Sequence, residues 1–299
     1  MAEVADNSVK PPRKLWMDLD NYAARQATEW KDSRPVDAAL MERIGRTPQA
    51  VWIGDWPGSK PSDTEAKARK AADAGEVFAV VVYNIAGRDS GGYSAGEAAT
   101  EAHYKVWIAG HAAAFAAAKA EAIVILEPDA LPQLQNLSAN DQAKRLECLR
   151  YAAGCLKDAG VTVYQDAGHS NWHPAKEMAR RLQGANADLV DGFALNVSNT
   201  QPTSKLVPFA DEMRAFLQGA HYVIDTSRNG RDEVISEWCN PPDRLLGPEP
   251  TFETGIAACD AFLWVKRPGE SDGQRNGGPP AGQFWPDYAL GLAQRTWGS

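Results

Sequence analysis

The sequence has few cysteines, no long apolar run and no excess of basic residues. Four cysteines in 299 residues are too few for a fold held together by disulfides. No apolar run approaches the roughly 20 residues of a membrane-spanning helix. The formal net charge of -8 disfavours a nucleic-acid-binding protein, because a surface that binds phosphate is basic. We therefore expect a globular protein with neither a nucleic-acid nor a membrane partner.

Signatures of several cofactor-dependent classes are also missing. The sequence contains no phosphate-binding Gly-Lys-Ser/Thr loop and no dinucleotide fingerprint after the first predicted strand. It has no CxxC or HExxH pair that would indicate zinc. We expect no cofactor and no resident metal.

The cysteine positions predict at most one disulfide. Cys148 and Cys155 lie in a stretch of helical composition, where their Cα atoms would be roughly 10 Å apart and too distant to bridge. Cys239 and Cys259 remain as one candidate pair.

Seven short apolar runs predict the strands of a parallel sheet. Most are continuous rather than alternating, which is typical of parallel strands buried on both faces. Stretches of helical composition separate most of them, so the pattern is that of a single α/β domain. The predicted strands are Ala50–Ile53, Val77–Tyr83, Ala122–Leu126, Val161–Tyr164, Val190–Leu195, His221–Ile224 and Ala261–Val265. The predicted helices are Glu65–Ala74, Glu97–Ala120, Ala139–Ala159, Pro174–Gln183, Lys205–Gln218 and a closing helix in Phe284–Trp297.

Carboxylates follow most of these strands. In a βα barrel the C-terminal strand ends meet on one face, and in an open doubly wound sheet they line a crevice. Hydrolysis of a glycosidic bond needs a protonated acid beside ionised carboxylates, and burial and nearby cations separate the pKa values of crowded acids. The ten tryptophans include candidates for flat surfaces on which sugar rings stack. The strand-end acids are Asp89, Glu127, Asp129, Asp166, Asp225, Glu270 and Asp272, and the nearby cations are Arg88, Arg228 and Lys266.

Two other functions stay open at this point. Asp166, His169 and His173 are possible ligands for the ion of a metal-dependent barrel hydrolase. The simpler interpretation is that His169 shapes the floor of the site through a hydrogen bond. A carbohydrate-binding barrel without catalysis is the other alternative.

The ordered strand-end motifs resemble those of glycoside hydrolase family 6, the cellulases that act with inversion. The motifs are Val82-Tyr83-Asn84, Gly87-Arg88-Asp89, Glu127-Pro128-Asp129, Asp166-Ala167-Gly168-His169, Asp225 with Arg228-Asn229-Gly230, Glu237-Trp238-Cys239, and Lys266 through Asp272-Gly273. The resemblance covers residues 50–290 and implies a distorted, TIM-like barrel of seven parallel strands. We expect one catalytic domain over residues 1–299, with a polar N-terminal extension of about 14 residues.

The resemblance also implies roles for individual residues. Asp129 matches the proton donor, and Asp89 matches the neighbour that keeps the donor protonated. Asp272 matches one proposed catalytic base, Tyr83 a residue that favours distortion of the sugar ring, and Ser94 a serine that positions the attacking water. The expected sugar-binding residues are Trp52, Trp172, Trp238, His169, Asn196, Lys266 and Glu270.

The sequence departs from the family pattern at two positions. Ser90 and Gln274 stand where the family often has cysteine, so Cys239 lacks its usual partner. We therefore carry over none of the family's disulfides.

Short connections near the predicted site favour an endo-acting enzyme. Only about ten residues separate Asp272 from Gln283, and the segment from Asp89 to the helix near Glu97 is also short. Enzymes of this family that work from chain ends cover the site with longer loops, and such a cellobiohydrolase is the alternative. We expect a monomer that cleaves internal β-1,4 bonds of cellulose or related β-glucans.

The first 14 residues are polar and contain no apolar stretch like that of a signal peptide. Either the protein stays inside the cell, or the sequence is a mature domain behind an added methionine. The predicted substrate favours the second interpretation and an extracellular enzyme.

Overall fold

The structure is a computed structural model that describes residues 13–88 and 100–298. Seven strands form one sheet in the order of the sequence, and every neighbouring pair is parallel. The strands are β1 (Val51–Ile53), β2 (Phe78–Val82), β3 (Ala122–Leu126), β4 (Thr162–Asp166), β5 (Gly192–Leu195), β6 (His221–Asp225) and β7 (Cys259–Leu263). All seven predicted strands are confirmed, with ends that shift by two residues or fewer.

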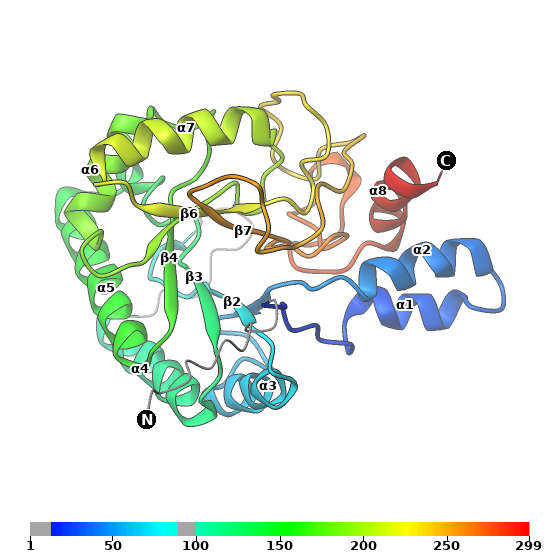
Figure 1. The fold of residues 1–299 in the computed structure, drawn as a ribbon, viewed down its shortest axis with the longest axis horizontal. Helices are drawn as coiled ribbons and strands as arrows, with labels where there is room; N and C mark the ends of the chain where they lie inside the picture. The colour runs from blue at the N-terminus through cyan, green and yellow to red at the C-terminus, as the bar shows by residue number, and fades with distance from the viewer. Residues whose placement is uncertain (1–12, 89–99, 299) are drawn as a thin grey trace, which may run out of the picture.

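Helices follow most strands and cover the outside of the sheet (Figure 1). The α-helices are α1 (Tyr22–Trp30), α2 (Pro35–Gly45), α3 (Pro61–Ala74), α4 (Glu101–Ala118), α5 (Ala139–Asp158), α6 (Ala175–Ala185), α7 (Thr203–Phe216) and α8 (Pro286–Trp297). Short 3-10 helices include Leu134–Asn136 and Arg275–Gly277.

Both faces of the sheet are buried, and alternate residues of each strand enter different cores. Val80 and Val82 of β2 pack against the surrounding helices. Val81 of β2 and Ile123 of β3 belong to the core inside the curled sheet. Because neither face meets water, the strands carry no polar alternation, which explains their continuous apolar sequence.

The sheet curls until its two edges approach each other. The N–H of Ala50, just before β1, donates to the carbonyl of Trp264, just after β7, at 2.9 Å. The indole Nε1 of Trp52 donates to the carbonyl of Val265 at 2.8 Å. The fold is the distorted seven-stranded parallel β/α barrel that the family resemblance implies.

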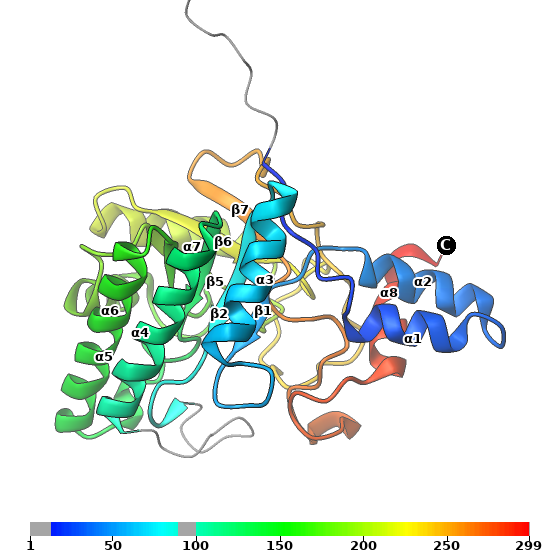
Figure 2. The same ribbon diagram turned by 90° about the horizontal axis from the view of Figure 1, so that it is seen from below.

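An N-terminal helical hairpin, α1 and α2, was not predicted. It packs with α8 beside the barrel, away from the helices α4–α7 (Figures 1 and 2). The Asn21 side chain caps α1 by accepting from the N–H of Ala24 at 3.0 Å, and its amide donates to the carbonyl of Gly45 at 2.8 Å. A Cβ on Gly45 would lie 2.7 Å from the nitrogen of Ala24, so glycine permits this close approach of the two helices.

Local residues define both ends of α5. The Ser138 side chain accepts from the N–H of Asp141 at 3.2 Å and caps α5. Gly160 follows the C-terminus of α5 with a φ of 76°. All four cysteines are free, so Cys239 and Cys259 do not form a pair. Among the described residues, no helix combines the length and apolar character needed to cross a membrane.

We expect Gly192→Ala to destabilise the barrel. A Cβ at Gly192 in β5 would lie 2.2 Å from the carbonyl oxygen of His221 in the neighbouring strand, and neither strand can shift freely. The expected loss is about 2–3 kcal/mol in the free energy of unfolding, measured by urea denaturation. Gly154→Ala is the matched control, because Gly154 lies within α5 with open space around its Cα. The control should be neutral or gain up to about 1 kcal/mol. Equal effects of the two substitutions would contradict the packing argument.

Candidate active site

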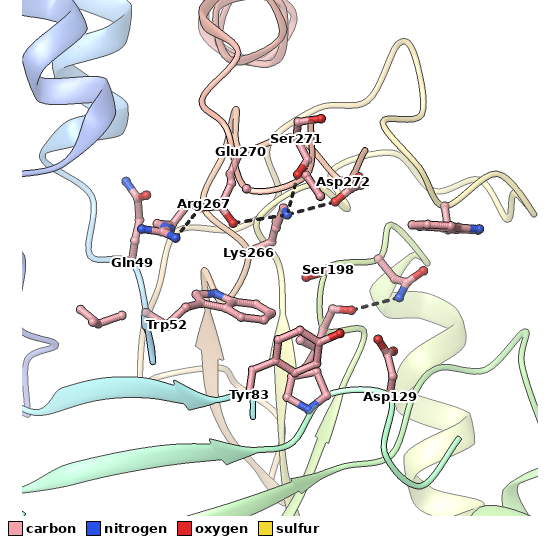
Figure 3. Close-up of a pocket in the computed structure, with 18 of the residues that line it drawn as sticks. Gln49, Trp52, Tyr83, Asp129, Ser198, Lys266, Arg267, Glu270, Ser271 and Asp272 are labelled. Atoms are coloured by element: carbon pink, nitrogen blue, oxygen red, sulfur yellow. Dashed lines mark hydrogen bonds and ion pairs between the residues drawn. The ribbon is translucent and has the colours of Figure 1, made fainter. Parts of the chain in front are cut away.

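A cleft of about 1390 Å³ lies over the C-terminal ends of the strands. It brings together residues from the ends of β1, β2, β3, β4 and β7 (Figure 3). The residues predicted from sequence that line it are Trp52, Tyr83, Asp129, His169, Trp172, Trp238, Lys266, Glu270 and Asp272. Asp89 and Ser94 lie outside the described residues.

Asp129 stands at the cleft surface on a turn after β3. Its φ of 69° is in the left-handed region, which is uncommon for a residue with a side chain. Its backbone N–H donates to Oδ2 of Asp166 at 2.9 Å, and this bond holds the turn in place. Asp129 is only partly buried, so its carboxyl group can reach a ligand in the cleft.

Asp166, at the end of β4, supports this turn from below. Its side chain is almost fully buried. Burial, and secondly the negative charge of Asp129, raise the pKa of Asp166 well above its usual range. Asp166 is therefore a structural acid that braces the turn beneath Asp129.

Glu127 fixes the segment that leaves β2. Its fully buried carboxylate accepts from the N–H of Asn84 at 2.9 Å and from the N–H of Ile85 at 3.0 Å. Burial raises the pKa of Glu127 to about 7, although these two N–H groups act in the opposite direction. Glu127 is thus a bracing residue two positions from Asp129.

Arg145 of α5 holds the same segment from its carbonyl side. The guanidinium is buried, and it donates to the carbonyls of Ala86 at 3.0 Å and Gly87 at 2.7 Å. It also donates to the carbonyl of Ala130, next to Asp129, at 3.3 Å. The segment after β2 and the turn that carries Asp129 therefore share one buried cation.

Asp272 lies between two cations. Its Oδ2 lies 2.6 Å from Nη1 of Arg228 and accepts from the N–H of Asn240 at 2.8 Å. Its Oδ1 lies 3.1 Å from Nζ of Lys266. Burial alone would raise the pKa of Asp272, but Arg228 and Lys266 outweigh it and lower the pKa below its usual value. Asp272 is therefore ionised, and both of its oxygens are engaged.

A row of alternating charges continues from Asp272 along one wall of the cleft (Figure 3). Lys266 Nζ lies 3.5 Å from Oε1 of Glu270. The other oxygen of Glu270 pairs with Arg267. Because Glu270 is buried and paired with two cations, its carboxylate is held in one position in the wall of the cleft.

Aromatic rings form another part of the wall. Trp52 and Tyr83 meet edge to face, with ring centroids 5.5 Å apart and an interplanar angle of 85°. Arg88 lies 5.3 Å above the Tyr83 ring and pairs with Asp55 at 2.6 Å. Trp238 is 45% exposed, which leaves its ring accessible for stacking.

His169 and Trp172 line the cleft in the loop after β4. Burial, with a smaller effect of His173, lowers the pKa of His169 to about 4, so the ring is neutral at pH 7. The N–H of Asn171 donates to its Nδ1 at 3.2 Å, which places the ring proton on Nε2 as a donor. His173 is held by the carbonyl of Pro132 at 2.7 Å. In the described chain, no group of three or more His, Cys, Asp or Glu side chains has the arrangement of a metal site.

Asn196 differs from its predicted role. It is fully buried, its amide donates to the carbonyl of Asp225 at 2.8 Å, and its oxygen accepts from the N–H of Gln201 at 2.9 Å. Asp225 itself accepts from backbone N–H groups, including that of Ser198 at 2.9 Å and that of Lys266 at 3.0 Å. Both side chains therefore brace the rim of the barrel, because their polar atoms are used by the main chain.

Sequence reasoning overlooked several residues of the cleft. Trp56 lines it, in the Gly-Asp-Trp motif that directly follows the first strand, so its position was a usable signal. Arg267 lies next to Lys266 in the motif that carries the resemblance. Tyr22 and Gln49 come from the region of the unpredicted hairpin, and no strand-end pattern marks them.

The buried carboxylate of Glu127 predicts a pH dependence of stability. The unfolded chain releases the Glu127 proton near pH 4.5 and the folded protein near pH 7, so this group makes stability fall as pH rises between these values. We expect Glu127→Gln to reduce the fall in unfolding free energy between pH 5 and pH 7.5 by up to about 3 kcal/mol. The measurement is urea denaturation at both pH values, with the exposed Glu253→Gln as control. An unchanged pH slope in Glu127→Gln would refute the assignment.

Comparisons with known proteins show the family of the chain. The family model for glycosyl hydrolases family 6 matches residues 11–296. Endoglucanase A of Cellulomonas fimi is 42% identical over 269 residues, which cover 89% of this chain and 58% of that protein. Endoglucanase A of Thermobispora bispora is 40% identical, with 90% of this chain and 60% of that protein covered. The chain thus spans about 60% of the length of these two relatives.

A solved structure matches nearly the whole fold. The endoglucanase Cel6 from Mycobacterium tuberculosis, solved in complex with methyl-cellobiosyl-4-deoxy-4-thio-β-D-cellobioside, superposes with a TM-score of 0.85 at 36% sequence identity. The match covers 95% of this chain and 97% of that one. The barrel, the strand-end acids and these similarities together show that the chain belongs to glycosyl hydrolase family 6.

Proposed function

We propose that this protein is an endo-β-1,4-glucanase that hydrolyses cellulose or a related β-glucan with inversion. The observation that carries the proposal is the partly exposed Asp129 in a long cleft with aromatic and charged walls. The relatives named endoglucanase support the same activity, and the thio-linked cello-oligosaccharide in the Mycobacterium tuberculosis structure supports a glucan ligand.

Asp129 is proposed as the general acid that protonates the leaving glycosidic oxygen. Its turn is fixed from below by Asp166 and at its side by Arg145, so the carboxyl group is held toward the cleft. Tyr83 is proposed to crowd the sugar ring at the cleavage point and so to favour its distortion. Trp52 is proposed to stack on the neighbouring sugar ring. A fixed acid and a distorted ring are what an oxocarbenium-like transition state requires.

The surroundings of Asp272 favour an electrostatic role over direct proton abstraction. A general base works best when its pKa is near the working pH and one of its oxygens faces the water. Asp272 has a lowered pKa, and its oxygens are bound to Arg228, Lys266 and Asn240. We propose that Asp272 stabilises positive charge in the transition state. Asp89 and Ser94 retain the roles that the family resemblance implies, Asp89 as the neighbour that keeps the donor protonated and Ser94 as the residue that positions the attacking water.

The loop after Asp272 supports an open cleft. It is closed at its base by the N–H of Ser271, which donates to the carbonyl of Gln283 at 2.9 Å. The Asn240 amide donates to the carbonyl of Gly273 at 2.6 Å, and Asn276 donates to the carbonyl of Cys239 at 2.9 Å. The loop thus folds back onto segment 239–240, and these hydrogen bonds stand where the family often has a disulfide.

We further propose that residues 1–299 act as one catalytic domain, as a monomer and without a cofactor. The sugar-binding set is proposed as Trp52, Trp172, Trp238, His169, Lys266 and Glu270, without Asn196. A polymeric glucan does not enter cells, so we propose that the enzyme works outside the cell.

Asp129→Ala should abolish most of the activity on soluble carboxymethyl cellulose. Loss of a general acid costs about 100-fold or more in kcat. Viscosity and reducing ends are followed together, with Asp73→Ala, an exposed residue of α3, as control. We expect the wild type and the control to lower viscosity early with few new ends. New ends without a fall in viscosity would instead indicate a cellobiohydrolase, and no hydrolysis of any β-glucan would overturn the proposal.

Inversion predicts that the first product carries the α-anomeric configuration. The displacement by water occurs in one step on the face opposite the leaving oxygen. Proton NMR of cellopentaose hydrolysis, recorded before mutarotation, should show the α signal rising first. Initial release of the β anomer would refute the inverting mechanism while leaving the hydrolase assignment intact.

A further inference from the structure

The cleft continues past Trp52 onto the N-terminal hairpin. Its lining includes Tyr22 and Arg25 of α1, Asp20 just before α1, and Gln49 just before β1. None of these residues has a part in the hydrolysis proposed above. Of these, Gln49 lies on the side of Trp52 that faces away from Asp129 (Figure 3).

The charged wall of the active site leads directly to this extension. From Asp272 the ion pairs run through Lys266 and Glu270 to Arg267. The guanidinium of Arg267 then lies 5.8 Å from the centre of the Tyr22 ring. Tyr22 therefore stands at the outer end of the same wall that contains the predicted sugar-binding residues.

The Tyr22 ring is held rigidly but remains accessible. It stacks on Phe284 with ring centroids 5.7 Å apart and an interplanar angle of 16°. Phe284 in turn forms a β-bridge with Glu270, so the support of the ring belongs to the active-site wall. Asn21, directly before Tyr22, caps α1 and ties it to Gly45. Despite this support, Tyr22 is 44% exposed.

An aromatic ring that stacks on a second ring and has polar side chains beside it is suited to bind a sugar. Sugar rings present C–H groups to an aromatic face, and their hydroxyls bind charged and amide side chains. Beside Tyr22 the exposed pair of Arg25 and Asp20 lies 2.7 Å apart, and Gln49 lines the same stretch. Because the Tyr22 ring is already fixed before a sugar binds, binding costs little side-chain conformational entropy.

We propose that Tyr22 forms an additional binding position for one glucosyl unit, beyond the unit that stacks on Trp52. The inference rests on the proposed β-glucan substrate and adds length to the chain segment that the cleft holds. Its consequence is a preference for longer glucan segments, since a unit bound there contributes affinity only when the chain reaches the hairpin.

The test is binding of cello-oligosaccharides of increasing length, from triose to heptaose, by titration calorimetry. An Asp129→Ala background prevents hydrolysis during the measurement. We expect affinity in this parent to rise with each unit until the cleft is filled. Tyr22→Ala should reach its plateau one unit earlier and bind the longest sugars about five- to tenfold more weakly, while the shortest sugars bind as in the parent.

Two controls separate this role from a structural one. Tyr22→Phe keeps the ring and should restore the parent's length dependence. Tyr151→Ala removes an aromatic residue of α5 that is 40% exposed and does not line the cleft, and it should change nothing. A Tyr22→Ala curve equal to the parent's, or weakened equally at every length, would overturn the additional position alone. A parent that binds no cello-oligosaccharide would overturn the proposed substrate as well.

Discussion

The buried ion pair between Arg228 and Asp272 joins the rim of the barrel. Arg228 follows β6 and Asp272 follows β7, and the guanidinium of Arg228 also donates to the carbonyl of Ser198 after β5. Removing two charges from water is costly, and the pair is stable only because Lys266 and the N–H of Asn240 complete its contacts. The loops of three strands, and with them the floor and one wall of the cleft, therefore depend on this single set of contacts.

The buried carboxylates at the rim have two different kinds of partner, cations or backbone N–H groups, and the kind of partner determines the direction of the pKa shift. Asp272 is surrounded by cations, which lower its pKa against the effect of burial. Glu127 and Asp225 are held mainly by backbone N–H groups, and burial raises the pKa of both. The C-terminal edge of the sheet thus carries one acid with a lowered pKa and two acids with raised pKa values. Acid catalysis by carboxyl groups relies on such a separation of pKa values.

The N-terminal hairpin changes the extent of the site rather than its chemistry. Its small core with α8 includes Met41 and Ile44 of α2 and Trp264, which follows β7. Because Trp264 leads into Val265, whose carbonyl holds the indole of Trp52, the hairpin and the cleft share one support. Packing of the hairpin therefore places Tyr22 at a defined position relative to the wall of the active site.

The strands and the strand-end acids could be predicted from the sequence alone. Parallel strands buried on both faces require continuous apolar segments, and their polar residues are confined to the ends, so both features are visible along the chain. Helix α1 was missed because its nine residues, Tyr22–Trp30, form a short segment in which alanines alternate with polar side chains, and its buried alanines, Ala23 and Ala27, find their core only where α2 and the distant α8 pack against it. The partners of each acid were decided only by the tertiary structure. Asp272 meets Arg228 across 44 positions, and Asn196 turns to the carbonyl of Asp225 across 29. Local sequence shows which groups are available at the rim, whereas the curl of the sheet decides which of them meet each other and which face the cleft.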